Sequence, residues 1–210
     1  MTSSTSTQLP GRSRIGGLLD YRTVDLVTAA MFGVAFGVAY FGWDQAYTGV
    51  NALFSFYLPA SGLLGGPWLM AGVVAGLVVR RPGAALLAEL VAANVEYLVG
   101  GQWGASTMIA GLLQGAGAEL VLAIFLYRRF NVWVAALSGI AAAIAEAVYE
   151  WGAYYADWSM TYKLLYAGLF AVSGALVAGL LGSLLVRALA VSGALDAFPA
   201  GHEHRDRHAI

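Results

Sequence analysis

An uncharged apolar run near the C-terminal end of the chain, Leu164–Val186, reads LLYAGLFAVSGALVAGLLGSLLV. A helix rises 1.5 Å per residue, so about 20 apolar residues cross a bilayer core of about 30 Å. Five earlier runs have a similar length and character: Val24–Trp43, Gly62–Val79, Gly83–Val99, Gly104–Tyr127 and Asn131–Tyr155. The sequence therefore predicts an all-α integral membrane protein with six transmembrane helices.

The composition of the chain agrees with a membrane protein and excludes several other classes. Of the 210 residues, 60% are hydrophobic and 11% are charged, which is far from the balance of a soluble globular protein. A net charge of -1 provides no basic surface for DNA or RNA, so nucleic acid is not an expected partner. Because the chain contains no cysteine, disulfides, thiolate zinc sites and iron–sulfur clusters are excluded.

The distribution of cations predicts the orientation of the six helices, because Lys and Arg are retained on the cytoplasmic side. Only one of the eleven cations, Lys163, falls on the outer side of the predicted bundle. We therefore expect both termini in the cytoplasm, with residues 1–23 and 191–210 as tails and residues 24–190 as the transmembrane domain. The other ten cations fall on the inner side: Arg12, Arg14, Arg22, Arg80, Arg81, Arg128, Arg129, Arg187, Arg205 and Arg207.

The sequence also allows predictions for the first outer loop, the first helix and the C-terminal end. Pro and Asn interrupt the apolar segment Asp44–Ser61, which predicts a long outer loop with a short interfacial or re-entrant helix. No small-residue cleavage site follows the first helix, so it is expected to be a retained anchor rather than a signal peptide. The segment Gly201–Ile210 carries three histidines near acidic residues, and a solvated chain end is favoured there over a metal site.

Five glutamates lie inside the predicted helices, where a charged side chain costs about 2.5–3.5 kcal/mol. Glu89 and Glu96 are seven residues apart and Glu146 and Glu150 are four apart, so each pair shares a helix face. Counted from the cytoplasmic arginines, Glu96 and Glu150 fall in the outer half of the membrane and Glu119 in the inner half. A structural hydrogen bond is the plain interpretation of Glu119, whereas two outer carboxylates with a single lysine nearby indicate a site.

Aromatic and polar residues gather in the same outer half of the membrane. Aromatic faces stack on flat rings and attract cations, and carboxylates accept hydrogen bonds from amino groups. For Trp43, Trp158 and Tyr162, the ordinary aromatic belt at the membrane interface is the favoured interpretation. The predicted binding site for a flat, hydrogen-bonding or cationic ligand comprises Glu96, Gln102, Trp103, Glu150, Tyr97, Trp151, Asn94 and Tyr149.

The sequence carries no catalytic signature. HExxH, GxSxG and P-loop motifs are absent, and all three histidines lie in the C-terminal tail. We therefore expect no enzyme activity, no metal site and no cofactor, and any energy from ATP must come from other subunits.

The first helix carries small residues one turn apart, which let another helix approach closely. One set comprises Ala29, Gly33 and Gly37, and a second comprises Ala35 and Ala39. Small residues are common in membrane helices, so this spacing alone is a weak indication of a partner.

The stretch from Arg81 to Phe130 reads RPGAALLAELVAANVEYLVGGQWGASTMIAGLLQGAGAELVLAIFLYRRF. It resembles the signature region of the YkoE family, whose members are substrate-binding S components of energy-coupling-factor (ECF) transporters. The resemblance extends over nearly the whole chain, and its matching segments are RPGAALLAELVA, GGQWG, GLLQGAGAEL and YRRF. It implies an S-component-like bundle in the cell membrane that binds thiamin or hydroxymethylpyrimidine.

The same resemblance implies partners. A transmembrane coupling subunit and ATPase subunits, which bind the ATP, would work with this chain. S components resemble one another in docking the first helix on the coupling subunit, so the small residues of that helix are assigned to docking. An aminopyrimidine would donate hydrogen bonds to Glu96 and Gln102 and place its flat ring on Trp103.

Two other functions remain open from the residues alone. One is a self-sufficient proton-coupled carrier of a small cationic amine, with Glu89, Glu119 or Glu146 as the proton relay. The other is an intramembrane enzyme, which has little support because the aspartates, Asp44 among them, lie at predicted helix ends rather than in a pair.

Overall fold

The computed structural model describes residues 21–208, and all regular structure in this part of the chain is helical. The α-helices are α2 (Thr23–Ala52), α3 (Met70–Val79), α4 (Ala84–Leu98), α5 (Ser106–Ile124), α6 (Val132–Ala153), α7 (Met160–Ser173), α8 (Gly182–Val191) and α9 (Pro199–His208). Two 3-10 helices, η1 (Leu58–Leu64) and η2 (Gly66–Leu69), precede α3, and a π-helix, η3 (Gly174–Leu181), joins α7 to α8.

Four helical segments are long and apolar enough to cross a bilayer, namely α2, α5, α6 and the continuous segment Met160–Val191. A fifth candidate is η1 together with Gly66–Val79, which meet at a bend of 41°. The remaining predicted span, Gly83–Val99, is present as α4, but its 15 residues give about 22 Å of helix, less than a bilayer core of about 30 Å. The chain is therefore an all-helical, multi-pass membrane protein with four or five candidate spans.

The first helix is longer than predicted. α2 continues past Trp43 to Ala52, so half of the expected outer loop is helical, and residues 53–57 alone separate it from η1. The helix continues through Asp44 because this carboxylate is buried and satisfied from outside the helix. It accepts hydrogen bonds from the indole N–H of Trp103 and the backbone N–H of Gln102.

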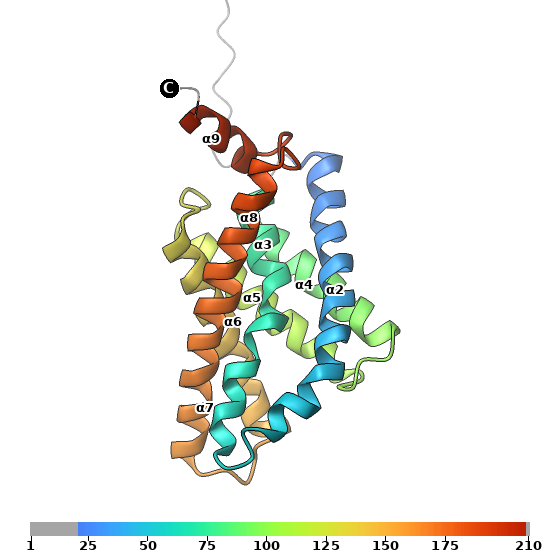
Figure 1. Cartoon of the computed structure of the whole chain (residues 1–210), viewed down its shortest axis with the longest axis vertical. Helices are drawn as coiled ribbons and strands as arrows, with labels where there is room; N and C mark the ends of the chain where they lie inside the picture. Colours follow the sequence, from blue (N-terminus) through green and yellow to red (C-terminus); the bar gives the residue numbers. More distant parts are fainter. Residues whose placement is uncertain (1–20, 209–210) are drawn as a thin grey trace, which may run out of the picture.

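α2 lies along α4 (Figure 1), and the two backbones approach each other through small residues. A Cβ on Gly33 would lie 2.7 Å from the carbonyl oxygen of Ala88, and a Cβ on Gly37 would lie 2.6 Å from that of Ala92. Ala29 is buried on the same face. The prediction that these three residues dock a partner subunit is therefore wrong, because their face holds α2 against α4 within the chain.

The second set of small residues lies on another face of α2. Ala35 and Ala39 are exposed, as are the neighbouring apolar side chains of Met31, Val34 and Val38. No described part of the chain covers this face, so it is open to lipid or to a partner helix.

A side chain of α5 caps the N-terminus of α4. Glu119 accepts hydrogen bonds from the backbone N–H of Gly83 at 2.6 Å, the backbone N–H of Ala85 at 3.0 Å and the hydroxyl of Tyr127 at 2.6 Å. Burial and the nearby Glu119 carboxylate raise the pKa of Tyr21, at the same end of α4, to about 12. A helix N-terminus leaves backbone N–H groups without partners and carries partial positive charge, so a carboxylate there is structural.

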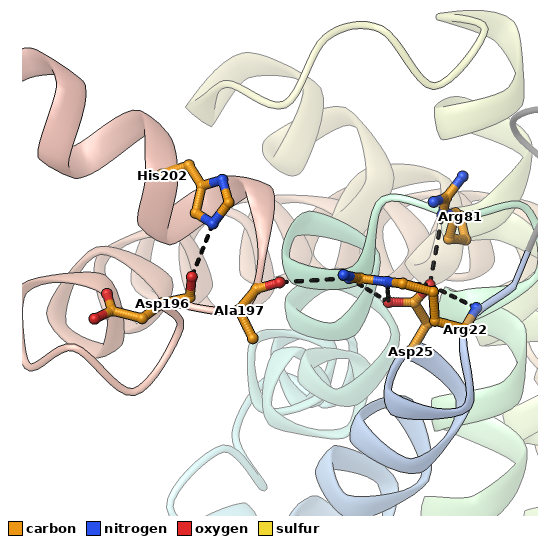
Figure 2. A network of polar contacts seen from close by, with 6 residues as sticks. All are labelled: Arg22, Asp25, Arg81, Asp196, Ala197 and His202. Carbon is orange, nitrogen blue, oxygen red and sulfur yellow. Dashed lines mark hydrogen bonds and ion pairs between the residues drawn. The ribbon is translucent and has the colours of Figure 1, made fainter.

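Charged residues from distant parts of the chain meet at the end of the bundle where α2 begins and α9 lies (Figure 1). Asp25, which is 1% exposed, lies 2.8 Å from the guanidinium of Arg22 and 3.6 Å from that of Arg81. Figure 2 shows that Arg22 also reaches the C-terminal segment, where it donates to the carbonyl oxygen of Ala197 at 3.4 Å. The two halves of the chain are thus joined at this end by buried and half-buried charge.

The C-terminal segment packs on the bundle through residues that precede the predicted solvated end, whereas His202, Glu203, Arg205 and Asp206 within that end are exposed. Leu195 and Phe198 are buried. Arg80, which follows α3, donates two hydrogen bonds to Glu203 of α9, at 2.6 and 2.9 Å. These two apolar side chains therefore anchor the segment, and the ion pair joins α9 to the end of α3.

Candidate ligand-binding site

A cavity lies within the helical bundle, and its walls come from segments spread along the chain. The lining has three carboxylates, one carboxamide and many aromatic rings, and it includes no Lys, Arg or His among the described residues. Its members are Tyr40, Tyr47, Ser61, Gly65, Trp68, Ala93, Glu96, Trp103, Ser106, Thr107, Ala110, Gln114, Glu146, Tyr149, Glu150, Tyr154, Tyr166 and Phe170.

Two carboxylates on one face of α6 form the acidic wall of the cavity. Glu146 accepts a hydrogen bond from the side-chain amide of Gln114 on α5. One turn later, Glu150 accepts a hydrogen bond of 2.5 Å from the hydroxyl of Tyr166 on α7. Each carboxylate has further acceptor capacity, which a ligand with N–H groups or a positive charge can use.

The third carboxylate, Glu96, is on α4 and is 2% exposed. Its neighbours are Asp44 of α2 and the segment that follows α4. Asp44 accepts hydrogen bonds of 3.2 Å from the indole N–H of Trp103 and 3.2 Å from the backbone N–H of Gln102. Asp44 therefore lies behind the cavity wall, while Glu96 and Trp103 form part of the wall.

Glu89 lies deeper and is held by other donors. Its two carboxylate oxygens are each 3.3 Å from the hydroxyl of Tyr40, and one accepts the backbone N–H of Gly72 at 2.8 Å. The Tyr40 hydroxyl in turn accepts the backbone N–H of Ala71 at 2.8 Å. Glu89 thus joins α2, α3 and α4 behind the cavity.

Aromatic rings form a continuous wall on the other side. The ring of Tyr47 has its centroid 5.3 Å from that of Trp68 and 5.5 Å from that of Trp103, both in edge-on geometry. Tyr154 continues the wall at 5.8 Å from Trp103. Such rings present apolar faces to a flat ligand, and their π-electrons attract cations.

Three polar atoms of the wall are buried without a hydrogen-bond partner among residues 21–208: Trp68 Nε1, Glu96 Oε1 and Thr107 Oγ1. An unmade hydrogen bond at a buried atom costs about 1–3 kcal/mol, so a cluster of such atoms indicates a function. The cluster offers one donor, one acceptor and one hydroxyl. It is therefore suited to a ligand that both donates and accepts hydrogen bonds.

Charge in and around the cavity has one sign. The ion pairs observed among the described residues involve the carboxylates of Asp25, Asp196 and Glu203, all at the opposite, α9 end of the molecule. Within residues 21–208, no ion pair reaches the carboxyl groups at the cavity, which are Asp44, Glu89, Glu96, Glu146 and Glu150. Buried carboxyl groups without a counter-ion favour a ligand with a positive charge or with amino donors.

The structure brings together half of the predicted site residues. Glu96, Trp103, Tyr149 and Glu150 line the cavity. The other four predicted residues, Gln102, Tyr97, Trp151 and Asn94, do not line it.

Their surroundings explain why. Gln102 bonds to Asp44 behind the wall, with its side-chain amide 3.1 Å from the Asp44 carbonyl oxygen. Asn94 is exposed and donates to the carbonyl oxygen of Leu90 at 2.7 Å, and Tyr97 is exposed on the same helix. Sequence position alone could not separate the inward face of each helix from its outward face.

Several lining residues were missed by sequence reasoning. Gln114 could have been found from the sequence, because a carboxamide inside an apolar helix is a polar group that needs a partner. Glu146, which the sequence analysis pairs with Glu150 on one helix face, also lines the cavity, beside Gln114. Trp68 and Thr107 gave no signal, because a tryptophan or threonine in a membrane helix is ordinary.

A membrane-embedded helical bundle that encloses an acidic, aromatic cavity and carries no nucleotide-binding motif has the features of a substrate-binding subunit of a transporter. Comparison with solved structures agrees: a structure described as "Crystal structure of an S-component of ECF transporter" superposes with a TM-score of 0.85 and 29% identity, covering 90% of this chain and 96% of the other. The fold is that of an S component, and the chain is a transporter subunit rather than an enzyme.

Two sequence comparisons place it more closely. A family described as "ABC-type cobalt transport system, permease component" matches residues 24–145. The protein described as "Putative HMP/thiamine permease protein YkoE" of Bacillus subtilis (strain 168) is 31% identical over 186 residues, which are 87% of this chain and 92% of that protein. The chain belongs to the YkoE family of ECF S components.

Proposed function

We propose that this S component binds thiamin or its hydroxymethylpyrimidine precursor. The observation that carries the proposal is the cluster of three buried, unpartnered polar atoms in the wall of an aromatic cavity. An aminopyrimidine has an amino group that can donate to Glu96 Oε1 and ring nitrogens that can accept from Trp68 Nε1 and Thr107 Oγ1. The name of the YkoE relative, which specifies HMP and thiamine, supports the same ligand class.

The acidic wall of the cavity is suited to the thiazolium ring of thiamin. Its thiazolium ring carries a fixed positive charge, and Glu146 and Glu150 lie without a counter-ion in the same cavity. Among residues 21–208, no three His, Cys, Asp or Glu side chains are grouped so that they could hold a metal ion. This donor set favours an organic cation over the metal ion in the description of the matched permease family.

The test is a titration of the purified protein with thiamin and with hydroxymethylpyrimidine. Glu150→Gln keeps the size and the acceptor for Tyr166 but removes the charge, so it should weaken thiamin binding by about tenfold, or about 1.4 kcal/mol. Binding of the uncharged pyrimidine should change much less. A matched control is Asp157→Asn, which removes an exposed carboxylate outside the cavity lining. Equal losses for both ligands would contradict the charge assignment, and no binding of either ligand would exclude the proposed substrate.

We further propose six membrane crossings with both termini in the cytoplasm, the tails being residues 1–23 and 191–210. α4 then provides the short sixth crossing, assisted by the residues that flank it. The meeting of Arg22, Arg80 and Arg81 at one end of the bundle supports this orientation, because cations are retained on the cytoplasmic side. Residues 24–190 form the substrate-binding domain in this proposal.

An S component acts together with an ECF module, and we propose that α2 contacts the coupling subunit of that module. Ala35 and Ala39 on its uncovered face are small enough to let another helix approach closely. The other small residues, Ala29, Gly33 and Gly37, already pack against α4. ATP is bound by the ATPase partners in this assembly.

A self-sufficient proton-coupled carrier remains the second candidate, because buried carboxyl groups without counter-ions also occur in proton relays. The cap on α4 engages Glu119, which leaves Glu89 and Glu146 for such a role. Vesicles containing this chain alone separate the two functions. An S component should bind ligand without accumulating it, whereas a carrier should accumulate it and lose that uptake when the pH gradient is collapsed.

A further inference from the structure

Asp44, like Glu89, is a buried carboxyl group that lies behind the cavity wall and is absent from the cavity lining. Its side chain is 2% exposed and lies beside Trp103 and Glu96, which do line the cavity. One oxygen accepts the indole N–H of Trp103, and the other accepts the backbone N–H of Gln102, both at 3.2 Å. Asp44 thereby fixes the plane in which the Trp103 ring faces the cavity.

Asp44 also lies close to a second carboxyl group, that of Glu96, because Gly101 places no side chain between them. A hydrogen bond between two carboxyl groups requires a proton on one of them. Gly101 permits this close arrangement, since a Cβ there would lie 2.9 Å from Glu96 Cγ and 3.0 Å from Asp44 Oδ2. The remaining Glu96 oxygen, Oε1, is the unpartnered acceptor in the cavity wall.

The surroundings determine which of the two groups holds the proton. Two N–H groups donate to Asp44, and hydrogen bonds to a carboxylate favour its ionised form. Glu96 has no such donors among residues 21–208 and lies in a wall without cations. The titratable groups that face the pair are Tyr40 and Tyr47 on α2, Glu89 on α4, and Glu146 and Glu150 on α6, and none of them carries positive charge.

We propose that Asp44 is a positioning residue for the ligand site: it orients Trp103 and accepts a proton-mediated hydrogen bond from Glu96, so that Glu96 presents a neutral acceptor, Oε1, to a ligand amino group. The inference rests on the proposed function for the identity of the ligand. Glu96 then differs from Glu150, since it recognises a donor by hydrogen bonding and leaves the positive charge to the α6 carboxylates.

Substitutions at Glu96 give a distinctive pattern. Glu96→Gln places an N–H toward Asp44 and a carbonyl oxygen toward the cavity, so it imitates the protonated acid, whereas Glu96→Ala removes both groups. With thiamin and hydroxymethylpyrimidine as probes, Glu96→Ala should lose at least tenfold in affinity and Glu96→Gln should recover most of that loss. If Glu96→Gln loses as much as Glu96→Ala, the charge of Glu96 is required and the proposal is overturned.

Substitution of Asp44 tests positioning. In Asp44→Asn, the amide group cannot accept from both Trp103 and Gln102, because one of its two ends is a donor. Binding should weaken at least tenfold while the protein stays folded, with Asp157→Asn as the control for the same chemical change at an exposed position. A folded Asp44→Asn protein with wild-type affinity would overturn the proposal.

The pH dependence of binding distinguishes positioning from simple structural support. Loss of the shared proton at alkaline pH leaves two negative charges side by side and breaks the hydrogen bond between Glu96 and Asp44. The affinity of the wild-type protein for ligand should therefore fall as the pH rises. Glu96→Gln has no such proton and should show a flatter profile. The other cavity groups titrate in both proteins, so the difference between the two profiles reports the Asp44–Glu96 pair. Parallel profiles would contradict the shared proton.

Infrared spectroscopy of the ligand-free protein decides the protonation without reference to any substrate. The difference spectrum between wild type and Glu96→Gln at neutral pH should contain the C=O absorption of a protonated carboxylic acid. Absence of that absorption would overturn the proposal even if both ligands bind. Conversely, if neither probe binds the wild type, the proposed ligand is excluded, and the infrared spectrum still decides the state of the acid pair.

Discussion

At the scale of single residues, the glutamates of this chain acquire different roles from the donors that surround them. Glu119 faces the N-terminus of a helix, Glu89 faces a tyrosine and a backbone amide, and Glu150 faces a tyrosine in an open cavity. The residue type is the same in each case. Its function follows from whether protein donors occupy its oxygens or leave acceptor capacity for a ligand.

Removing the cap on α4 should therefore lower stability and leave ligand recognition intact. In Glu119→Ala, the amides of Gly83 and Ala85 and the hydroxyl of Tyr127 lose their acceptor, which should cost at least about 2 kcal/mol. Thermal unfolding in detergent measures the loss, and Glu119→Gln, which keeps one acceptor oxygen, should lose less. Unchanged thermal stability with abolished transport would instead support a relay role for Glu119.

At the scale of one element, α2 has two faces of small residues with opposite tasks. The face with Gly33 and Gly37 meets the carbonyl groups of α4, and the face with Ala35 and Ala39 is uncovered. Both faces have the same four-residue spacing in the sequence. The neighbours of the helix, rather than the spacing, determine which face holds the fold together and which one is available to another subunit.

A pair of leucine substitutions on this helix separates the two tasks. Gly37→Leu must displace the backbone of α4, since even a Cβ would lie 2.6 Å from the carbonyl oxygen of Ala92, so folding and ligand binding should both be impaired. Ala39→Leu should leave binding by the isolated protein unchanged and reduce uptake in cells that contain all subunits. Normal uptake by Ala39→Leu would remove the docking assignment from this face.

At the scale of the whole molecule, the two ends of the bundle are chemically different. Arginines and the C-terminal helix gather at one end, where Arg80 pairs with Glu203 and Arg22 pairs with Asp25. The cavity with its unpaired carboxyl groups lies away from these cations. This polarity is suited to a subunit that takes up its ligand on one side of the membrane and contacts cytoplasmic partners on the other.

The proposed six crossings predict which loops face outward. The chain contains no cysteine, so single cysteines can be introduced without background labelling. In intact cells, a membrane-impermeant maleimide should label cysteines at Ser55 and Ser159 but not at Arg129 and Ser192, all four of which are exposed positions. Labelling of all four after membrane permeabilisation is the control. Labelling of Arg129→Cys in intact cells would contradict six crossings.

The helical membrane class and the family follow from the sequence alone, which also predicts a ligand site in the outer half of the membrane. These features depend on local properties: apolar runs longer than a bilayer core, a continuous signature from Arg81 to Phe130, and carboxylates that are costly in lipid wherever they lie. Of the residues that the sequence predicts to bind substrate, Glu96, Trp103, Tyr149 and Glu150 line the cavity, and their contact with substrate stays a prediction.

The pairing of helix faces, in contrast, became visible in the folded structure. It turned Gly33 and Gly37 toward α4, extended α2 through Asp44, and added Trp68 and Thr107 to the cavity. In an almost uniformly apolar helix, the sequence has no periodic pattern of polar and apolar residues that would distinguish one side from the other. Apolar side chains are stable both in lipid and in the protein interior. Which side of such a helix faces a neighbour depends on residues far away in the chain, and a hydrogen bond such as that from Trp103 to Asp44 exists only once those residues are brought together.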